Sequence, residues 1–390
     1  MTRRGDPVWS PRKRATTLGY PCGRMVDYDI LIVGAGPAGC AAAIQIANKH
    51  PDLARRILVI EKAVFPRPKL CGGGVTTHAD DLLKRLRVQL DVPSFPIHAI
   101  KFVYADLAFT FRMKNIFRVV CREEFDAALA RSARERGVEL REGEAVVDIV
   151  RDDAGVRVQT KNGAYRAKIV IGADGANSVV RQKLGLARWD RIARLIEILT
   201  PADATRAPEF VEHTAVFDFT PIQRGVQGYY WDFPSFRQGV ATMNRGLGDM
   251  RVRPDRPRAE LKPIFAEALA RREIELDDAH LQGHPERWYD AALKHSAPRV
   301  LLAGDAAGTE PLFGEGISHA LDFGMFAADT AMRALVRGEF SFADYERRVA
   351  WSALGRRLQF KRAVAHVAYG NRGEWFYRLG WSVLRAVFGK

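Results

Sequence analysis

The sequence predicts an α/β fold: a mainly parallel sheet with crossover helices, an inserted sheet that is mainly antiparallel, and a C-terminal helical tail. Three observations predict it. An apolar run at 28–33 leads directly into a glycine-rich turn, two later apolar runs end in Asp174 and Asp305, and aromatic residues alternate at 229–233. With 390 residues, 47% hydrophobic and 27% charged, the chain can bury a large core.

The first of these observations predicts a Rossmann-like unit. The apolar strand is followed by Gly34-x-Gly36-x-x-Gly39 and then by an alanine-rich helix up to Lys49. In this motif the glycines permit the tight turn, the close approach of a pyrophosphate and the packing of helix on strand. A second strand ends at Glu61, twenty-two residues after Gly39, where an acid binds ribose hydroxyls. The unit therefore predicts a dinucleotide site.

The two Asp-bearing strands identify the dinucleotide. "AKIVIGADGANSVVR" (167–181) and "RVLLAGDAAGTEPLFGEGISHAL" (299–321) follow in the order found in the flavoprotein group of the aromatic hydroxylases and geranylgeranyl reductases, which this chain resembles. The resemblance implies FAD, with a loop after Asp305 that caps the flavin and a helix from Ile317. The cofactor-binding residues predicted from motif and resemblance together are Gly34, Ala35, Gly36, Pro37, Ala38, Gly39, Glu61, Lys62, Cys71, Gly72, Gly73, Arg122, Asp174, Gly175, Gly304, Asp305, Pro311, Gly314, Glu315, Gly316 and Ile317.

A narrower resemblance points to one branch of this group. "FPRPKLCGGGVT" (65–76), then Tyr229-x-Trp231-x-Phe233-Pro234, then "GDAAG" and "PLFGEGI", are similar to motifs of the geranylgeranyl reductase family. That resemblance implies an FAD-dependent oxidoreductase that saturates isolated C=C bonds in the prenyl chains of lipid-like substrates. The chain departs from the family pattern at Val226 and Ser235, which leaves head-group recognition open.

Two other classes of function are alternatives. The first is flavin-dependent monooxygenation or halogenation of an aromatic compound. Gly308 and Ser318 stand where hydroxylases usually carry histidine and asparagine, and Cys71-Gly72-Gly73 stands where halogenases have Gly-Glu-Ser, which disfavours this class. The second alternative is a flavin-bound lipid carrier without catalysis. The sequence contains no second nucleotide motif, so the electron donor, NAD(P)H or ferredoxin, is not predicted.

The residues expected to act on the substrate are Cys71 and the aromatic motif. Reduction of an isolated alkene needs a proton as well as a hydride, and Cys71 either donates that proton or simply fills a tight corner. Tyr229, Trp231 and Phe233 alternate at strand spacing and form either a wall for a prenyl chain or an ordinary core face. With Pro234 they are the predicted substrate-binding residues. Arg67 and Lys69 can meet an anionic head group or remain solvated.

Charge is concentrated at the two ends of the chain. Of the 60 Lys and Arg residues, six lie in 1–24 and eight in 351–390, and the net charge is +14. This pattern argues against a nucleic-acid groove, which would be basic within the folded body. In 373–390, cations on one stripe and apolar residues elsewhere predict a helix that lies on a membrane surface or packs against protein. The four cysteines indicate neither a disulfide framework nor a metal site.

The predicted organisation has four parts. No secretory signal or membrane span is expected, and Met25 is an alternative start. A cytoplasmic protein is the expectation, and peripheral membrane contact through the C-terminal helix stays open. Oligomeric state is not predicted. The parts are a disordered basic arm (1–24), an FAD-binding domain (25–98, 118–185 and 293–345), a substrate domain (99–117 and 186–292) and a C-terminal helical segment (346–390).

Overall fold

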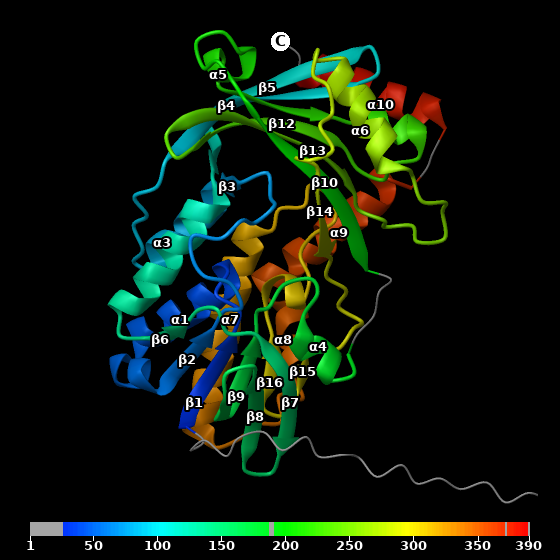
Figure 1. The fold of residues 1–390 in the computed structure, drawn as a ribbon. Helices are drawn as coiled ribbons and strands as arrows, with labels where there is room; N and C mark the ends of the chain where they lie inside the picture. The colour runs from blue at the N-terminus through cyan, green and yellow to red at the C-terminus, as the bar shows by residue number, and fades with distance from the viewer. Residues whose placement is uncertain (1–25, 187–190, 371–372, 389–390) are drawn as a thin grey trace, which may run out of the picture.

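Two large sheets lie at opposite ends of the molecule (Figure 1). A computed structural model describes residues 26–186, 191–370 and 373–388, so the predicted arm at 1–24 lies outside the described residues. The predicted fold class is confirmed: one sheet is mainly parallel and crossed by helices, the other is mainly antiparallel, and the described chain ends in helices.

The mainly parallel sheet contains the predicted Rossmann-like unit. β1, β2, β6, β9 and β16 run parallel, and β15, β8 and β7 extend the sheet by antiparallel pairing. Its strands are β15 (Ser296–Ala297), β16 (Val300–Leu302), β9 (Ala164–Gly172), β1 (Val26–Val33), β2 (Ile57–Ile60), β6 (Glu139–Arg141), β7 (Val146–Asp152) and β8 (Gly155–Thr160). β1 and β2 are buried throughout the part that pairs, as the apolar runs predict.

Helices pack against the mainly parallel sheet. They are α1 (Pro37–Lys49), α3 (Arg122–Glu135), α4 (Val179–Lys183) and α7 (Ile317–Arg337), with the short turns η1 (Pro51–Arg56) and η3 (Gly304–Ala306). α1 lies against both α3 and α7, and its residues 37–47 are all buried. The helix begins at Pro37 rather than at Cys40 because proline is well tolerated in a first turn. The predicted helix from Ile317 is confirmed as α7.

The second sheet pairs strands from two distant parts of the chain. Its spatial order is β14 (Gln282–Arg287), β10 (Ile192–Pro201), β13 (Val240–Asp249), β12 (Tyr230–Arg237), β11 (Thr214–Asp218), β4 (Ser94–Tyr104), β5 (Leu107–Val120) and β3 (Gly74–Thr76). All pairs are antiparallel except β11 with β4. β4 and β5 form a long hairpin, so the predicted boundaries at 98/99 and 117/118 fall inside these two strands.

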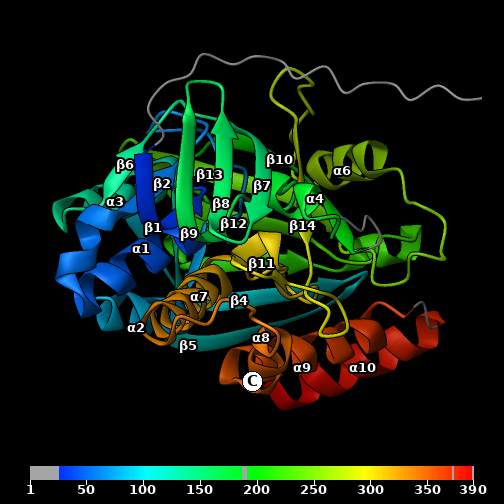
Figure 2. The same cartoon turned by 90° about the horizontal axis from the view of Figure 1, so that it is seen from below.

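The remaining helices flank the second sheet or lie toward the first. They are α2 (Thr77–Arg85), α5 (Pro208–Val211), α6 (Leu261–Ala270), α8 (Tyr345–Trp351), α9 (Ala353–Ala368) and α10 (Glu374–Phe388), with η2 (Thr220–Arg224). Of these, α2 and α8 bury residues in the core of the first sheet. Figure 2 shows α8, α9 and α10 along one side of the molecule, and α10 packs on β4 and β5. No helix in the described ranges is both long and apolar enough to cross a bilayer.

Candidate active site

The glycine-rich turn forms a cradle between β1 and α1. Gly34 has φ +98°, and a Cβ there would lie 2.4 Å from the carbonyl oxygen of Ala173. A Cβ on Gly39 would lie 1.8 Å from the carbonyl oxygen of Gly34. Both positions therefore require glycine for contacts within the protein. A Cβ on Gly36 would meet only the end of the Arg67 side chain, at 3.7 Å, so the space beside Gly36 is open.

Glu61 holds the cradle together at the end of β2. Its buried carboxylate accepts hydrogen bonds from the backbone N–H of Ala35 at 2.9 Å and of Ala63 at 3.1 Å. Arg67 lies 3.6 Å from the same carboxylate and 3.2 Å from Asp126. Arg67 is therefore bound to carboxylates inside the protein. This argues against both roles considered from the sequence, a solvated cation and a ligand of an anionic head group. The neighbouring Lys62 is exposed.

Arg122 connects α3 to the Cys71 loop (residues 65–74). Its guanidinium binds both carboxylate oxygens of Asp126, at 2.8 and 2.9 Å, one helical turn further along α3. The same side chain is within hydrogen-bonding reach of the Cys71 thiol. Both members of the ion pair are buried. The predicted cofactor-binding arginine is thus fixed in place by Asp126, a partner that the sequence analysis did not single out.

The two Asp-bearing strands end beside the cradle. Asp174 follows β9 and accepts a hydrogen bond from the backbone N–H of Val180 at 3.1 Å, which ties it to α4. Its other oxygen, Oδ1, is buried without a hydrogen-bond partner among the described residues, and burial raises the pKa of this carboxyl. Asp305 follows β16, and Gly304 before it has φ +59° with Ala38 of α1 directly against it.

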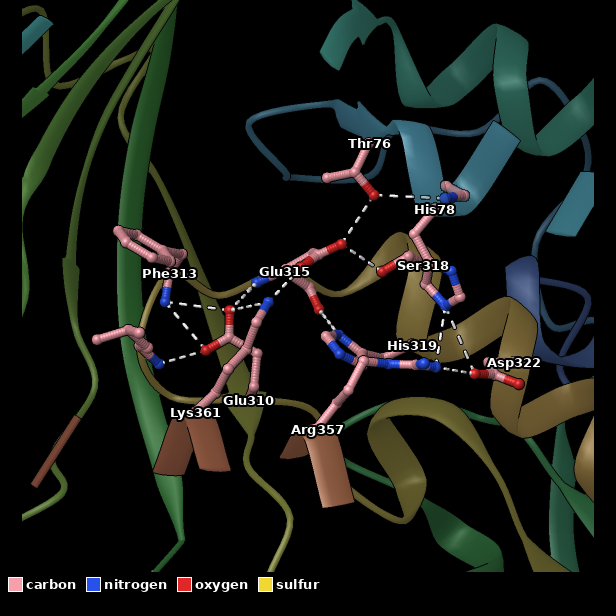
Figure 3. A network of polar contacts seen from close by, with 12 residues as sticks. Thr76, His78, Glu310, Phe313, Glu315, Ser318, His319, Asp322, Arg357 and Lys361 are labelled. Carbon is pink, nitrogen blue, oxygen red and sulfur yellow. Dashed lines mark hydrogen bonds and ion pairs between the residues drawn. The ribbon is translucent and has the colours of Figure 1, made fainter. Parts of the chain in front are cut away.

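The loop after η3 is held by its own carboxylates. Glu310 accepts hydrogen bonds from the backbone N–H of Leu312 at 2.5 Å, of Phe313 at 3.1 Å and of Glu315 at 3.0 Å. Glu315 in turn accepts from the hydroxyl groups of Thr76 at 2.8 Å and Ser318 at 2.5 Å (Figure 3). This loop therefore has a fixed shape that carries Pro311, Gly314 and Gly316.

The C-terminal helices anchor the same loop from the other side. Lys361 of α9 binds both Glu310 and Glu315 (Figure 3). The hydroxyl of Tyr369 donates to the carbonyl of Leu312 at 2.5 Å, and that of Tyr229 donates to the carbonyl of Phe313. The Glu315 carboxylate, predicted to bind the cofactor, is engaged with protein partners in this arrangement.

The Cys71 loop joins the two sheets. The backbone N–H of Cys71 donates to Glu197 of β10 at 3.1 Å, and its carbonyl accepts from Asn244 of β13 at 2.9 Å. Asn244 also accepts from the indole N–H of Trp231 at 2.7 Å. The thiol of Cys71 is partly buried and free. The loop therefore ties the cofactor cradle to the aromatic motif.

Protein contacts explain two of the three glycines in this loop. A Cβ on Gly72 would lie 3.0 Å from the ring of Phe233. Gly73 has φ +75°, and a Cβ there would lie 2.2 Å from the carbonyl oxygen of Val120. Gly72 and Gly73, two of the predicted cofactor-binding residues, make room in the structure for the ring of Phe233 and for the β5 backbone.

The aromatic motif forms a continuous row of rings. The ring centroids of Tyr229 and Trp231 are 6.2 Å apart and those of Trp231 and Phe233 are 6.4 Å apart. Phe217 of β11 packs against Tyr229 and Phe233 at 5.0 and 5.1 Å. All four rings are buried. Trp231 and Phe233 share one face of β12 with Tyr229, which directly precedes the strand, while the buried Pro234 alternates to the other face.

Four ionisable residues near the Cys71 loop were not proposed as catalytic residues from the sequence. Glu197 and Glu286 are buried, and burial raises their pKa values to about 7 and about 8. His284 contacts Lys69, and burial, followed by Lys69 itself, lowers the histidine pKa to about 3. Glu197 follows Leu195 by two residues, and Glu286 follows His284 by two, which is the spacing at which side chains share one face of a strand. This spacing was the sequence signal that could have identified these residues.

Comparisons with known proteins identify the family of this chain. A family model described as an FAD binding domain matches residues 27–322. A digeranylgeranylglycerophospholipid reductase of Methanosarcina acetivorans is 30% identical, over 82% of this chain and 78% of its own. The chain belongs to the geranylgeranyl reductase family of FAD-dependent oxidoreductases. A menaquinone reductase of Mycolicibacterium smegmatis is also 30% identical to this flavoprotein and covers 77% of it, with 75% of its own chain matched.

Solved structures share the fold of this flavoprotein. A geranylgeranyl bacteriochlorophyll reductase-like protein from Thermoplasma acidophilum has a TM-score of 0.73 and 23% identity, covering 89% of this chain and 87% of its own. The halogenase PltM has a TM-score of 0.68 and 17% identity, covering 88% of this chain and 76% of its own. At such identities these likenesses show the fold alone.

The residues at the site fit FAD, as predicted. The open space beside Gly36 suits a pyrophosphate at the N-terminus of α1, which no side chain caps. The unpaired Oδ1 of Asp174 and the partly exposed Asp305 can accept hydrogen bonds from the cofactor. Glu61 lies at the end of β2, where the motif expects the ribose.

Proposed function

We propose that this flavoprotein saturates C=C bonds in the prenyl chain of a lipid-like substrate. One observation carries the proposal: the Cys71 loop is bonded to both sides of the site. On the cofactor side, Arg67 of the loop lies 3.6 Å from Glu61 of the cradle. On the other side, Glu197 and Asn244 hold the backbone of Cys71, and Gly72 lies against the ring of Phe233. A thiol, a cofactor cradle and a row of aromatic rings therefore meet at one loop. The names of the two relatives at 30% identity, which refer to a digeranylgeranyl lipid and to menaquinone, support this substrate class.

The chain's own residues would have three tasks. Bound FAD, when reduced, supplies a hydride. Cys71 holds a proton at Sγ for the second alkene carbon, since an isolated alkene has no carbonyl group to bear developing charge. Tyr229, Trp231 and Phe233 exclude water and orient an apolar chain, which is where most of the rate acceleration must arise.

The test separates the reductase from its alternatives. The bound FAD is reduced without oxygen, and either a geranylgeranylated glycerophospholipid or menaquinone is added. We expect the flavin to be reoxidised, with a product heavier by two hydrogens per bond reduced. Reoxidation by oxygen that yields a hydroxylated or chlorinated aromatic product, with no reaction toward either lipid, would contradict the proposal. No reaction with any of these compounds would support a lipid carrier.

The outer face of α10 supports contact with a membrane surface. Trp375, Leu379, Val383 and Val387 recur every fourth residue, and their exposed fractions are 69, 59, 54 and 61%. The opposite face packs on the sheet, where the ring of Trp381 lies 5.4 Å from that of Tyr104. Residues 351–390 carry eight cations and one acid. An apolar stripe beside cations fits the surface of an anionic bilayer.

Vesicle flotation tests the membrane contact. The full chain is expected to float with vesicles of phosphatidylglycerol and phosphatidylcholine at low salt, and less at high salt. Replacing Trp375, Leu379 and Val383 together by serine should abolish flotation. Val240→Ser, at a valine that is 64% exposed on the hairpin of β13, is the matched control. Equal flotation of the triple variant and the control would contradict the proposed contact.

A further inference from the structure

Lys69 makes a contact inside the site that neither the sequence analysis nor the comparisons assign. Its Nζ lies 2.5 Å from Nε2 of His284, and both side chains are partly buried. Because an ammonium group can only donate, Nε2 of His284 accepts and the ring proton lies on Nδ1. Lys69 is therefore bound to protein rather than available to an anionic head group, the role considered from the sequence.

Strand register explains why this histidine faces the Cys71 loop. β10 and β14 pair antiparallel, with Leu195 opposite His284. Since side chains alternate along a strand, Glu197 and Glu286 lie on the same face as His284. Glu197 accepts the hydrogen bond from the N–H of Cys71, so this face is the one turned toward the loop. The Lys69–His284 pair thus lies on the Cys71 side of the second sheet.

Charged groups act on Lys69 from several elements. Cys71 lies in the same loop, and the others are His284 from β14, Arg122 and Asp126 from α3, Asp305 from η3, Glu197 from β10 and Glu286 from β14. Burial is the largest effect and lowers the pKa of the ammonium, whereas Asp305 and Asp126 oppose that shift. Lys69 is accordingly a stronger proton donor than an exposed lysine.

We propose that Lys69 resupplies the proton that Cys71 gives to the substrate, with His284 as the positioning residue; this rests on the proposed function. The Sγ–H bond of Cys71 breaks and a C–H bond forms at the carbon that did not receive the hydride. An Nζ–H bond of Lys69 then breaks and Sγ–H forms again. The neutral amine that remains takes a proton from solvent. Two electrons enter the alkene with the hydride, so the thiol is not oxidised.

His284 also borders a groove at the protein surface. This residue lines a groove of about 500 Å³ on the outer edge of β10 and β14, together with Arg194, Glu260 and Pro285. Arg194 is paired with Asp249 and so is not the group that delivers the proton. Lys69 therefore contacts His284, a residue that borders a solvent-facing groove.

Separating the first turnover from later ones tests the proposal. In Lys69→Met, the first alkene can use the proton already on Cys71, so single-turnover reoxidation of the flavin should stay within about twofold of wild type. Steady-state turnover should fall at least tenfold, because the thiol is not reprotonated, and added methylamine should restore part of it. The ultraviolet absorbance of the thiolate should persist after one turnover. Lys161→Met, at an exposed lysine in the turn between β8 and β9, is a control for loss of charge.

Lys69→Arg distinguishes proton donation from folding. Arginine keeps the positive charge but does not lose its proton in proteins. This variant should bind FAD with an unchanged absorption spectrum and show the same slow steady state. His284→Gln can still accept from Lys69 and should retain more turnover than His284→Leu. Normal steady-state turnover in Lys69→Arg, or equal losses in single and repeated turnovers without rescue by amine, would overturn the proposal. If wild-type flavin is not reoxidised by the lipid, the proposed function itself fails.

Discussion

Cys71 is the residue at which the two halves of the site meet. Arg122 reaches its thiol from α3, while Glu197 and Asn244 hold its backbone from the second sheet. The sequence analysis left two readings open, a proton donor and a residue that fills a corner. Any residue at this position would make the two backbone contacts, so the contact between the thiol and Arg122 is the one that supports the proposed donor role.

Replacing Cys71 tests that reading. Cys71→Ser and Cys71→Ala should keep FAD bound, because no cradle residue depends on the thiol, yet lose about 10²-fold or more in turnover. Cys121→Ser is the matched control, since Cys121 is also a partly buried free cysteine. Product formation and flavin absorbance are measured side by side. Wild-type rates in both Cys71 variants would remove the catalytic role.

Gly72 offers a second test at the level of a single residue. Because its Cβ would lie 3.0 Å from Phe233, Gly72→Ala should displace that ring and destabilise the protein by about 1–2 kcal/mol, and it should raise KM for the prenyl substrate. Gly74→Ala is the control, since a Cβ there meets Phe117 at an ordinary 3.6 Å. Chemical denaturation and substrate titration provide the readouts. Identical behaviour of the two variants would show that Phe233 does not need this space.

At the scale of elements, motifs that are contiguous in the sequence were predicted well. Gly34, Gly36 and Gly39 form one strand-turn-helix unit, so local geometry alone defines the cradle. His284 and Glu197 were not proposed because their position depends on the pairing of β10 with β14, which lie more than 80 residues apart in the chain. Register of that kind is set by tertiary packing, which single-sequence patterns do not encode.

The contact of α9 with the loop after η3 can be tested by mutating Lys361. Lys361 neutralises the carboxylates of Glu310 and Glu315, which are otherwise buried negative charges. Lys361→Met should therefore cost about 2–4 kcal/mol of unfolding free energy and reduce FAD content. Lys262→Met is the control: its pair with Asp278 is exposed and should contribute below about 1 kcal/mol. Equal stability of the two variants would show that α9 does not anchor the loop.

For the whole molecule, the fold class followed from the order of the motifs, whereas the extent of the second sheet did not. β3 and the first residues of β4 join that sheet from within the segment assigned to the FAD-binding domain. The β4–β5 hairpin crosses the predicted boundaries because its strands have 11 and 14 residues. Two sheets that are joined through the Cys71 loop are expected to unfold together.

Buried ionisable groups should give this unit a stability optimum at mildly acidic pH, where their two opposing effects overlap. Burial lowers the pKa values of His284 and His295 to about 3 and about 4, so stability is lost as pH falls below about 6.5, where the unfolded histidines bind protons. Burial raises the pKa values of Glu197 and Glu286 to about 7 and about 8. The folded state therefore binds more protons than the unfolded state from pH 4.5 up to these values, and stability falls as pH rises through that window.

Glu286→Gln isolates the alkaline limb of this profile. The amide can still accept the hydrogen bond that Thr309 donates at 2.5 Å, but it does not ionise. Unfolding free energies from urea titrations at pH 5, 6.5 and 8 should therefore decline less toward pH 8 in the variant, by on the order of 2–4 kcal/mol, since one pKa unit corresponds to about 1.4 kcal/mol. Between pH 5 and 6.5 the variant should also lose the Glu286 contribution, which in the wild type opposes that of the two histidines. Parallel profiles from pH 6.5 to 8 would show that Glu286 is ionised without cost in the folded protein, and that the polar face of β10 and β14 is better solvated than its burial implies.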